Sequence, residues 1–326
     1  MAPEFQTHVL ALPPSAAGLR LDQALAAALP QYSRARLQRW IRAGAVRSNG
    51  QPVRARDRVQ GGEQLTVQAE FALDERVAPE RLPLDILHED AALLVLNKPP
   101  GLVVHPGAGN REHTLQNALL AHDPALARVP RAGLVHRLDK DTSGVLLVAR
   151  TPEVHTRLVA ALAARTIGRE YLALCVGTPT GGGRIEQPIG RHRTARTRMA
   201  VRSDGREAVT NFRIAERFRA HTLLTVQLET GRTHQIRVHL SHIGLPIVGD
   251  PVYGGRMRAL GGAVPELAAA LAGLRRQALH AQRLQLKHPL TGRSQGFEAP
   301  LPADLAELLQ WLRLDARERA RSPRRT

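Results

Sequence analysis

The residues best suited to chemistry lie in one polar turn between two short apolar runs. Two carboxylates, Asp139 and Asp141, stand there among cationic or potentially cationic side chains: His136, Arg137 and Lys140. A carboxylate surrounded by cations stays ionised and can act as a nucleophile or as a base. The spacing by itself fits a polar turn with an internal ion pair equally well.

The element that positions this turn is a predicted buried strand. Its sequence is Val145-Leu146-Leu147-Val148-Ala149, five apolar residues bounded by Gly144 and Arg150. A short apolar run between turn residues is typical of a strand inside a core. We therefore expect the carboxylates to stand at the end of a central strand.

A tyrosine opens a second predicted strand, over residues 169–176. Its sequence is Arg169-Glu170-Tyr171-Leu-Ala-Leu-Cys175-Val176. A tyrosine at the edge of a strand is usually a core residue whose hydroxyl is tethered. Spacing alone leaves Tyr171 in that structural role.

A third polar group follows a predicted strand over residues 223–228. Gly231 permits a turn, and Thr233 is a candidate cap for a helix whose core face holds Ile236, Leu240 and Ile243. His234 and Arg237 are three residues apart, so both project from one face of this helix. His234, His239 and His242 do not have the spacing of a known zinc ligand set, and we expect no metal site.

Composition indicates a polyanionic partner. The chain has 326 residues and a formal net charge of +17, with only three lysines among its 46 basic residues. Such a balance favours RNA or DNA ahead of an anionic membrane surface. The single cysteine, Cys175, excludes an internal disulfide, and neither an apolar run of 18 residues nor a signal-peptide pattern is present. We expect a cytoplasmic protein without membrane contact.

The N-terminal part predicts a small α/β unit over residues 19–75, after a tail over residues 1–18 with one edge strand at 9–12. A helix over 21–29 ends at Pro30, a second helix begins after Ser33, and Asn49-Gly50 predicts a hairpin before a strand at 65–67. The second helix places apolar residues on one face and arginines on the other: Arg34, Arg36, Arg39 and Arg42. These arginines fit an RNA-binding surface, although a solvated helix face explains them equally well.

The rest of the chain predicts an α+β fold with a mixed, largely antiparallel sheet and flanking helices. After a linker over residues 76–84, this domain spans residues 85–300, and a C-terminal helix with a basic tail follows over 301–326. Strands are expected at 91–96 and 284–286, and helices after Thr114, after Thr151 and over 265–282. We expect the last helix around leucines 305–312 and a disordered tail from Arg317 to Arg325.

Three of these segments resemble known motifs. His136-Arg137-Leu138-Asp139, with Lys140 to Gly144, resembles the active-site motif of the RluA-type pseudouridine synthases, and Asn97-Lys98-Pro99-Pro100-Gly101 resembles their first motif. The pattern from Arg20 to Gly50 resembles the S-four-type RNA-binding domain. The resemblance runs from about residue 19 to about residue 312.

The resemblance implies isomerisation of uridine to pseudouridine in RNA, with no cofactor because the reaction needs no redox change. Asp139 would be the catalytic aspartate, Arg237 its partner, and Tyr171 the ring against the target uracil. Arg137 is the candidate to fill the vacated base stack. RNA contacts are expected from six residues: Arg36, Arg39, His136, Arg137, Arg232 and His234.

The expected substrate is 23S ribosomal RNA, in a large-subunit hairpin at the intersubunit bridge, free or in a precursor particle. A synthase acting on another RNA, such as tRNA, is the alternative, and the enzyme is expected to be a monomer. Three other classes were weighed. A non-catalytic ribosome-binding protein leaves the Asp139 turn without a purpose, a glycoside hydrolase needs a working pair of carboxylates, and a DNA glycosylase differs in product.

Overall fold

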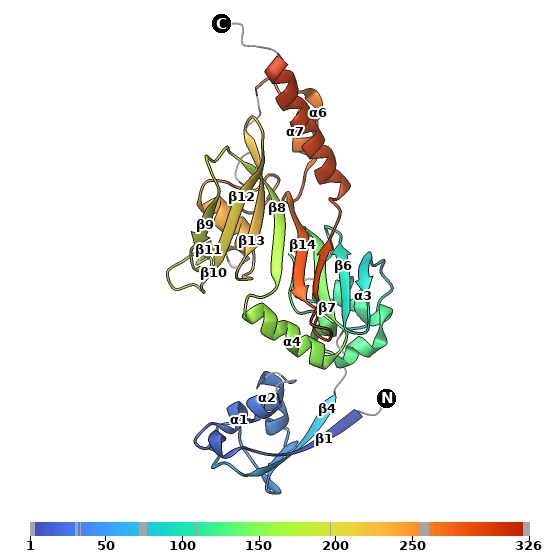
Figure 1. Ribbon diagram of the computed structural model, residues 1–326, viewed down its shortest axis with the longest axis vertical. Coiled ribbons are helices and arrows are strands. Elements are labelled where there is room, and N and C mark those ends of the chain that lie inside the picture. Colours follow the sequence, from blue (N-terminus) through green and yellow to red (C-terminus); the bar gives the residue numbers. More distant parts are fainter. Residues whose placement is uncertain are drawn as a thin grey trace.

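Figure 1 shows the computed structural model, which describes residues 4–29, 32, 34–71, 77–107, 110–195, 197–254 and 261–321. A four-stranded sheet lies in the N-terminal part, and a nine-stranded sheet dominates the remainder. All neighbouring strands of the large sheet are antiparallel except one parallel pair. The predicted α+β class with a mixed, largely antiparallel sheet is confirmed.

The small sheet has the order β1-β4-β2-β3 and carries two helices. Its elements are β1 (Glu4–Ala11), α1 (Leu21–Ala28), α2 (Arg34–Arg42), β2 (Val46–Ser48), β3 (Gln51–Pro52) and β4 (Gln64–Phe71), with a 3-10 turn at Pro14–Ala16. Leu25, Leu37 and Trp40 of the helices are buried against Val46 and Leu65 of the sheet. The predicted edge strand is longer than expected and begins at Glu4, because β1 pairs with β4 along its whole length. The helix stop at Pro30 and the cap at Ser33 lie outside the described residues.

The predicted hairpin of this unit is present. Asn49 and Gly50 have φ values of 47° and 80°, and they join β2 to β3. Positive φ at both central residues is the geometry that asparagine and glycine tolerate best in a two-residue hairpin turn.

The large sheet has the order β5-β6-β7-β14-β8-β13-β12-β9, with β15 paired to β14. Its strands are β5 (Ile86–Glu89), β6 (Leu93–Lys98), β7 (Ser143–Ala149), β8 (Gly168–Val176), β9 (Gly183–Glu186), β12 (Val209–Arg217), β13 (His221–Leu228), β14 (Leu279–Lys287) and β15 (Ser294–Glu298). A separate hairpin of β10 (Ile189–Arg191) and β11 (Met199–Val201) lies beside it (Figure 1). Every residue of β7 is buried, as its apolar run predicted.

Helices cover both faces of this sheet. They are α3 (Leu115–His122), α4 (Pro152–Ala163), α5 (Gln235–His242), α6 (Pro265–Gly273) and α7 (Ala303–Arg321), with 3-10 turns at Pro124–Arg128 and Pro130–Gly133. Alternate residues of β6 belong to different cores, since Leu94 packs in the cluster of α3 and Leu93 in the cluster of α4. The caps predicted at Thr114 and Thr151 are confirmed, because each side chain accepts a backbone N–H from the first turn.

The turn that carries Asp139 leads directly into β7, where β7 makes its parallel pairing with β14. Gly144 has a φ of 113°, and a Cβ atom there would lie 2.1 Å from the carbonyl oxygen of Ala281. Only glycine permits this close approach of two backbones. The turn is therefore pinned between neighbouring strands rather than free at the surface.

Three predictions about helices were wrong. The helix predicted over 265–282 ends at Gly273, because residues from Leu279 pair with β8 and this pairing outweighs the helical propensity of the alanines. Ile243 is 40% exposed instead of facing the core. The predicted disordered tail is helical as far as Arg321, where α7 ends.

Among the described residues, no helix has the length and the apolar character needed to cross a membrane. In the same part of the chain, no cluster of three or more histidine, cysteine, aspartate or glutamate side chains is suited to hold a metal ion.

Candidate active site

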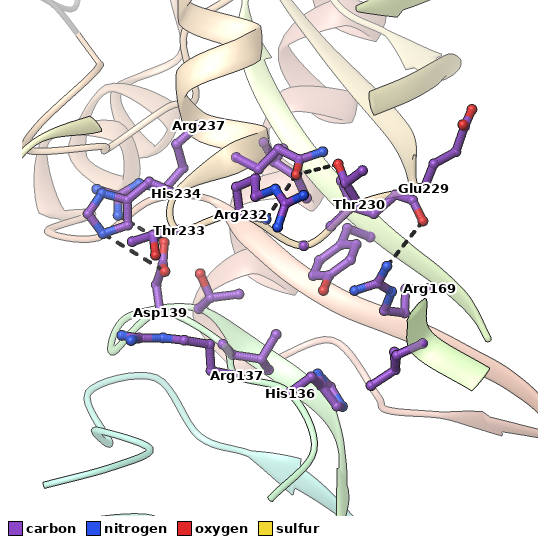
Figure 2. A pocket seen from close by; sticks show the side chains of 18 of the residues that line it. His136, Arg137, Asp139, Arg169, Glu229, Thr230, Arg232, Thr233, His234 and Arg237 are labelled. Carbon is purple, nitrogen blue, oxygen red and sulfur yellow. Dashed lines mark hydrogen bonds and ion pairs between the residues drawn. The ribbon is translucent and has the colours of Figure 1, made fainter. Parts of the chain in front are cut away.

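A cavity of about 510 Å³ opens between the Asp139 turn, β8 and the loop from β13 to α5. Its lining includes every predicted site residue of the large domain: His136, Arg137, Asp139, Tyr171, Arg232, His234 and Arg237. Figure 2 shows Asp139, His234 and Arg237 clustered at one end and Arg169 at the other. Arg36 and Arg39 lie elsewhere, on α2 of the small unit.

Asp139 is held by one strong contact and keeps one oxygen open. Its Oδ2 accepts a hydrogen bond from Arg237 Nη1 at 3.0 Å, and its side chain is 16% exposed. The other oxygen, Oδ1, lies 3.9 Å from His234 Nε2. A carboxylate that is fixed through one oxygen and open at the other is suited to attack or to proton abstraction.

Backbone contacts fix the turn that carries Asp139. The Thr142 N–H donates to the Asp139 carbonyl, and Lys98 Nζ donates to the Lys140 carbonyl at 2.8 Å. The same ammonium donates to the carbonyls of Pro99 and Leu102, at 2.7 and 2.9 Å. Lys98 therefore ties residues 98–102 to the turn that carries Asp139, a role that its spacing did not indicate.

Lys98 is 1% exposed, and this burial lowers its pKa to about 7, against the opposing effect of Asp141 and Asp139. Below pH 7 the folded and unfolded states both hold the proton. Between pH 7 and the ordinary value of 10.5 only the unfolded state holds it, so stability rises with pH across this window.

We expect Lys98→Met to remove this rise. From pH 7 to pH 9 the wild-type protein should gain about 2 kcal/mol of unfolding free energy relative to the variant. Urea unfolding of both proteins at the two pH values measures the difference. An equal pH dependence would mean that the three carbonyls keep the ammonium charged in the folded state.

Asp250 is a site residue that the sequence analysis missed. Its Oδ2 accepts from Arg237 Nε at 2.7 Å and its Oδ1 from Arg237 Nη2 at 2.9 Å. Burial opposes the charge on Arg237, but the carboxylates of Asp250 and Asp139 outweigh it and raise its pKa. Asp250 is fixed in turn by the N–H groups of Val252 and Tyr253. Asp250 therefore fixes the orientation in which Arg237 contacts Asp139.

We expect Asp250→Asn to lower kcat about tenfold and to leave KM for RNA within about twofold, because Arg237 loses its bidentate anchor. Single-turnover kinetics separate the two parameters. Asp250→Ala should also lower the unfolding free energy by about 3 kcal/mol, since it leaves a buried guanidinium without its main partner. An Asn variant with wild-type kcat would contradict this positioning role.

Tyr253 sets the orientation of His234. The Met199 N–H donates to the Tyr253 hydroxyl at 2.8 Å, and we assign the phenol proton to the 2.9 Å hydrogen bond with His234 Nδ1. Burial lowers the pKa of His234, so the neutral ring carries its proton on Nε2, the atom that faces Asp139. His234 thus presents a donor to the open side of the pocket.

The helix that carries Arg237 begins differently from the prediction. His234 has a φ of 56° and makes no side-chain cap, so the predicted cap at Thr233 was wrong. The buried amide of Gln235 replaces it, because its oxygen accepts from the Arg232 N–H and from the Thr230 hydroxyl. Its nitrogen donates to the Val209 carbonyl. This amide holds the loop that forms one wall of the pocket.

Tyr171 is 6% exposed and lines the pocket from β8. Burial raises the pKa of its phenol, while the nearby Arg169 guanidinium opposes the rise. Arg169 is a second residue that the sequence missed, although it stands in the same strand as Tyr171. Its Nε is buried and has no hydrogen-bond partner in the described part of the chain, so one donor of this pocket residue is unsatisfied.

His136 and Arg137 differ in state. His136 Nε2 accepts the Leu147 N–H at 3.0 Å, and burial lowers its pKa to about 3, so its ring is neutral. Arg137 is exposed and donates no hydrogen bond to any residue that the structure describes. Figure 2 shows the two side chains along the lower edge of the pocket. Arg137 is thus available to a ligand, whereas His136 serves the backbone of β7.

The other carboxylates and histidines do not form rival sites. Asp141 does not line the pocket, and Glu229 is paired with Arg165 and Arg184, so Asp139 has no working partner carboxylate among the residues that the structure describes. Both ring nitrogens of His239 are engaged, by Thr210 and by the Gln187 carbonyl. This geometry disfavours the glycoside hydrolase and zinc alternatives.

Comparison with known proteins gives a consistent result. The model of the RNA pseudouridylate synthase family matches residues 92–242, and the model of the S4 domain matches residues 19–65. The chain is 52% identical over 314 residues to the ribosomal large subunit pseudouridine synthase D of Xanthomonas campestris pv. campestris, across 96% of this chain and 95% of that one. It is 53% identical over 302 residues to the protein of the same name from Yersinia pestis, across 92% and 93% of the two chains.

A solved structure is also similar. The human RNA pseudouridylate synthase domain containing 4 aligns with a TM-score of 0.55 and 27% identity, over 70% of this chain and 93% of that one.

Proposed function

Since this chain belongs to the RNA pseudouridine synthase family, we propose that it isomerises specific uridines of large-subunit ribosomal RNA to pseudouridine. The observation that carries the proposal is the open carboxylate of Asp139, held by Arg237 at the end of a buried strand. Identity above half with relatives named for the large ribosomal subunit supports the choice of RNA. Such a substrate would place the enzyme in the cytoplasm.

The reaction breaks the bond from the ribose to N1 of uracil, turns the ring and joins C5 to the same sugar carbon. The proton on C5 is lost and a proton is gained at N1, so no redox partner is required. A stacked uridine is out of reach of Asp139, and the target must be flipped into the pocket. Arg137, exposed at the pocket edge, is proposed to replace it in the stack.

The roles of the remaining site residues follow from their positions. Asp139 attacks the sugar or removes a proton from it, Arg237 keeps that carboxylate ionised, and Tyr171 stacks on the uracil and assists removal of the C5 proton. Arg232 and His234 line the pocket from the loop between β13 and α5, where their donors are suited to the target nucleotide.

The small unit, matched by the S4 domain model, is proposed to hold RNA that flanks the target. Arg20, Arg42, Arg54 and Arg56 surround a hollow on it. The last three are exposed and donate no side-chain hydrogen bond within the described residues. These arginines are suited to phosphates, and Arg36 and Arg39 of α2 add positive charge to the same unit.

We expect the triple variant Arg42→Gln, Arg54→Gln and Arg56→Gln to weaken RNA binding and to leave the saturated rate intact. Each lost phosphate contact should remove about 0.7 to 0.9 from the slope of log K against log salt. Binding titrations at several salt concentrations measure this slope. The matched control, Arg317→Gln on α7, should change neither quantity, and a collapsed saturated rate in the triple variant would contradict the assignment.

The proposed function is tested by incubating the protein with unmodified ribosomal RNA and mapping pseudouridine. New pseudouridine in large-subunit RNA, absent with Asp139→Asn, is the expected result. Modification of tRNA alone would overturn the choice of substrate. Modification of no RNA would favour a non-catalytic RNA-binding protein, and release of a free base from DNA would favour a glycosylase.

A further inference from the structure

A second cavity, of about 420 Å³, adjoins the active-site pocket. Both cavities are lined by His136 and Arg137, so these two residues form a shared wall. The other lining residues of the second cavity are His105, Pro106, Gln116, Arg131 and Leu134. The mechanism proposed above uses none of these five.

The floor of this cavity carries unused hydrogen-bonding groups. Gln116 is only 5% exposed, yet its amide has a single partner among the described residues, His105 Nδ1 at 3.3 Å. Burial lowers the pKa of His105, so its neutral ring donates from Nδ1 to the amide oxygen and leaves Nε2 as an acceptor. The Gln116 nitrogen remains as a donor. A neighbouring donor and acceptor match the edge of any nucleobase.

The rim of the cavity is basic, and the backbone there is strained. Arg131 and Arg137 are exposed at the cavity. Burial lowers the pKa of His105 most, and the positive charges of these two arginines lower it further. Arg131 has φ and ψ of 55° and 38°, and Ala132 has 51° and 39°. Left-handed backbone at two successive residues with side chains costs about 1–3 kcal/mol at each and persists mainly at functional sites. Here the strained backbone holds the Arg131 guanidinium at the cavity, where this group can contact a phosphate.

Proline and leucine complete the lining. Pro106 is half-buried and apolar, so a flat ring can pack against it while its edge meets the amide and the imidazole. Leu134 is 1% exposed and closes the cavity from below. Proteins read single-stranded RNA by splaying out bases, stacking them on side chains and bonding their edges. The chemistry of the cavity therefore fits a nucleotide better than a free anion, which would leave the apolar surface and the amide unused.

We propose that this cavity receives a second unstacked nucleotide of the RNA substrate, the immediate neighbour of the target uridine. The proposal rests on the proposed function, because the first cavity must hold the target base. Two residues separate the cavities, so an RNA with its target in one has an adjoining nucleotide within reach of the other. Arg137 lies between the two cavities. Its guanidinium would then take the place of the target base in the stack, while one base is held in each cavity.

The first test uses a short hairpin RNA built around a uridine that the wild-type protein modifies. Gln116→Leu should raise KM for this RNA about tenfold, as for the loss of a base-edge contact, and should leave kcat within about twofold. Arg131→Gln, an exposed position that does not disturb the core, should raise KM in the same direction. The control Arg317→Gln should match wild type.

The second test locates the nucleotide. An abasic site placed 5′ or 3′ of the target should raise the wild-type KM about tenfold at one of the two positions. At that position, the abasic site should not increase the KM of the Gln116→Leu variant any further, since both changes remove the same contact. Fluorescence of 2-aminopurine at the same position should increase on binding to wild type.

The outcomes separate the two proposals. Two results would overturn the second-nucleotide site while pseudouridine formation continued. One is that the effects of Gln116→Leu and of the abasic site on KM multiply at both positions. The other is that the 2-aminopurine fluorescence changes at neither position. Failure of wild type to modify any RNA would overturn the proposed function instead. The fluorescence test with wild-type protein stands even where Gln116→Leu does not fold.

Discussion

Asp139→Asn is expected to abolish pseudouridine formation, with single-turnover rates reduced by at least about 10⁴-fold. The amide keeps the shape of the side chain and one acceptor for Arg237 Nη1, now 3.0 Å from Oδ2. It loses the charge and the nucleophilic oxygen on which both possible first steps depend. RNA affinity should stay within a few-fold, because the contacts to RNA are proposed to come mainly from arginines.

The chain supplies a matched control two residues away. Asp141 belongs to the same turn but does not line the pocket, so Asp141→Asn should retain most of the rate. Mass spectrometry of digested RNA, after single-turnover incubation with each variant, measures the product directly. Substantial product with Asp139→Asn, or equal loss in both variants, would refute the assignment of Asp139.

Tyr171→Phe is expected to lower the rate by about 10²-fold, as for the loss of an acid–base group. The ring remains and RNA binding should persist, because a phenylalanine of the same shape fits the site on β8. Burial raises the pKa of the phenol, so at neutral pH the hydroxyl is protonated in the free enzyme and able to bond to the bound uracil. Arg169 lines the same pocket, and its guanidinium opposes this rise in the pKa.

Release of tritium from C5-labelled uridine measures the step that Tyr171 is proposed to assist. The variant should show slower release, and a deuterium isotope effect at C5 that exceeds the wild-type effect, because proton removal becomes rate-limiting. Tyr32→Phe in the small unit is the control, since that hydroxyl contacts His8 far from the pocket residues. Equal rates for Phe and Tyr at position 171 would exclude the hydroxyl from the chemistry.

Local sequence determined the elements that bring the site together. The apolar run of β7, the caps at Thr114 and Thr151 and the Asn49-Gly50 turn depend on neighbouring residues, and each occurs where it was predicted. Such features follow from periodicity and turn chemistry, which a short window of sequence contains.

The resemblance to a family supplied what spacing left open, namely the reaction and the roles of Asp139, Tyr171 and Arg237. These roles stay predictions, as does the division of the chain into residue ranges. The contact between Arg237 and Asp139, by contrast, is observed, and it joins residues 98 positions apart.

Only the tertiary structure decided which polar groups became buried partners. Asp250 orients Arg237, Lys98 ties down the Lys140 carbonyl across 42 positions, and Tyr253 fixes the ring of His234. The same holds for residues 279–282, whose helical propensity yields to pairing with β8. The physical reason is common to all of them: burial makes an unpaired polar group costly, and its partner is chosen by which segments the sheet brings together, not by its neighbours in sequence.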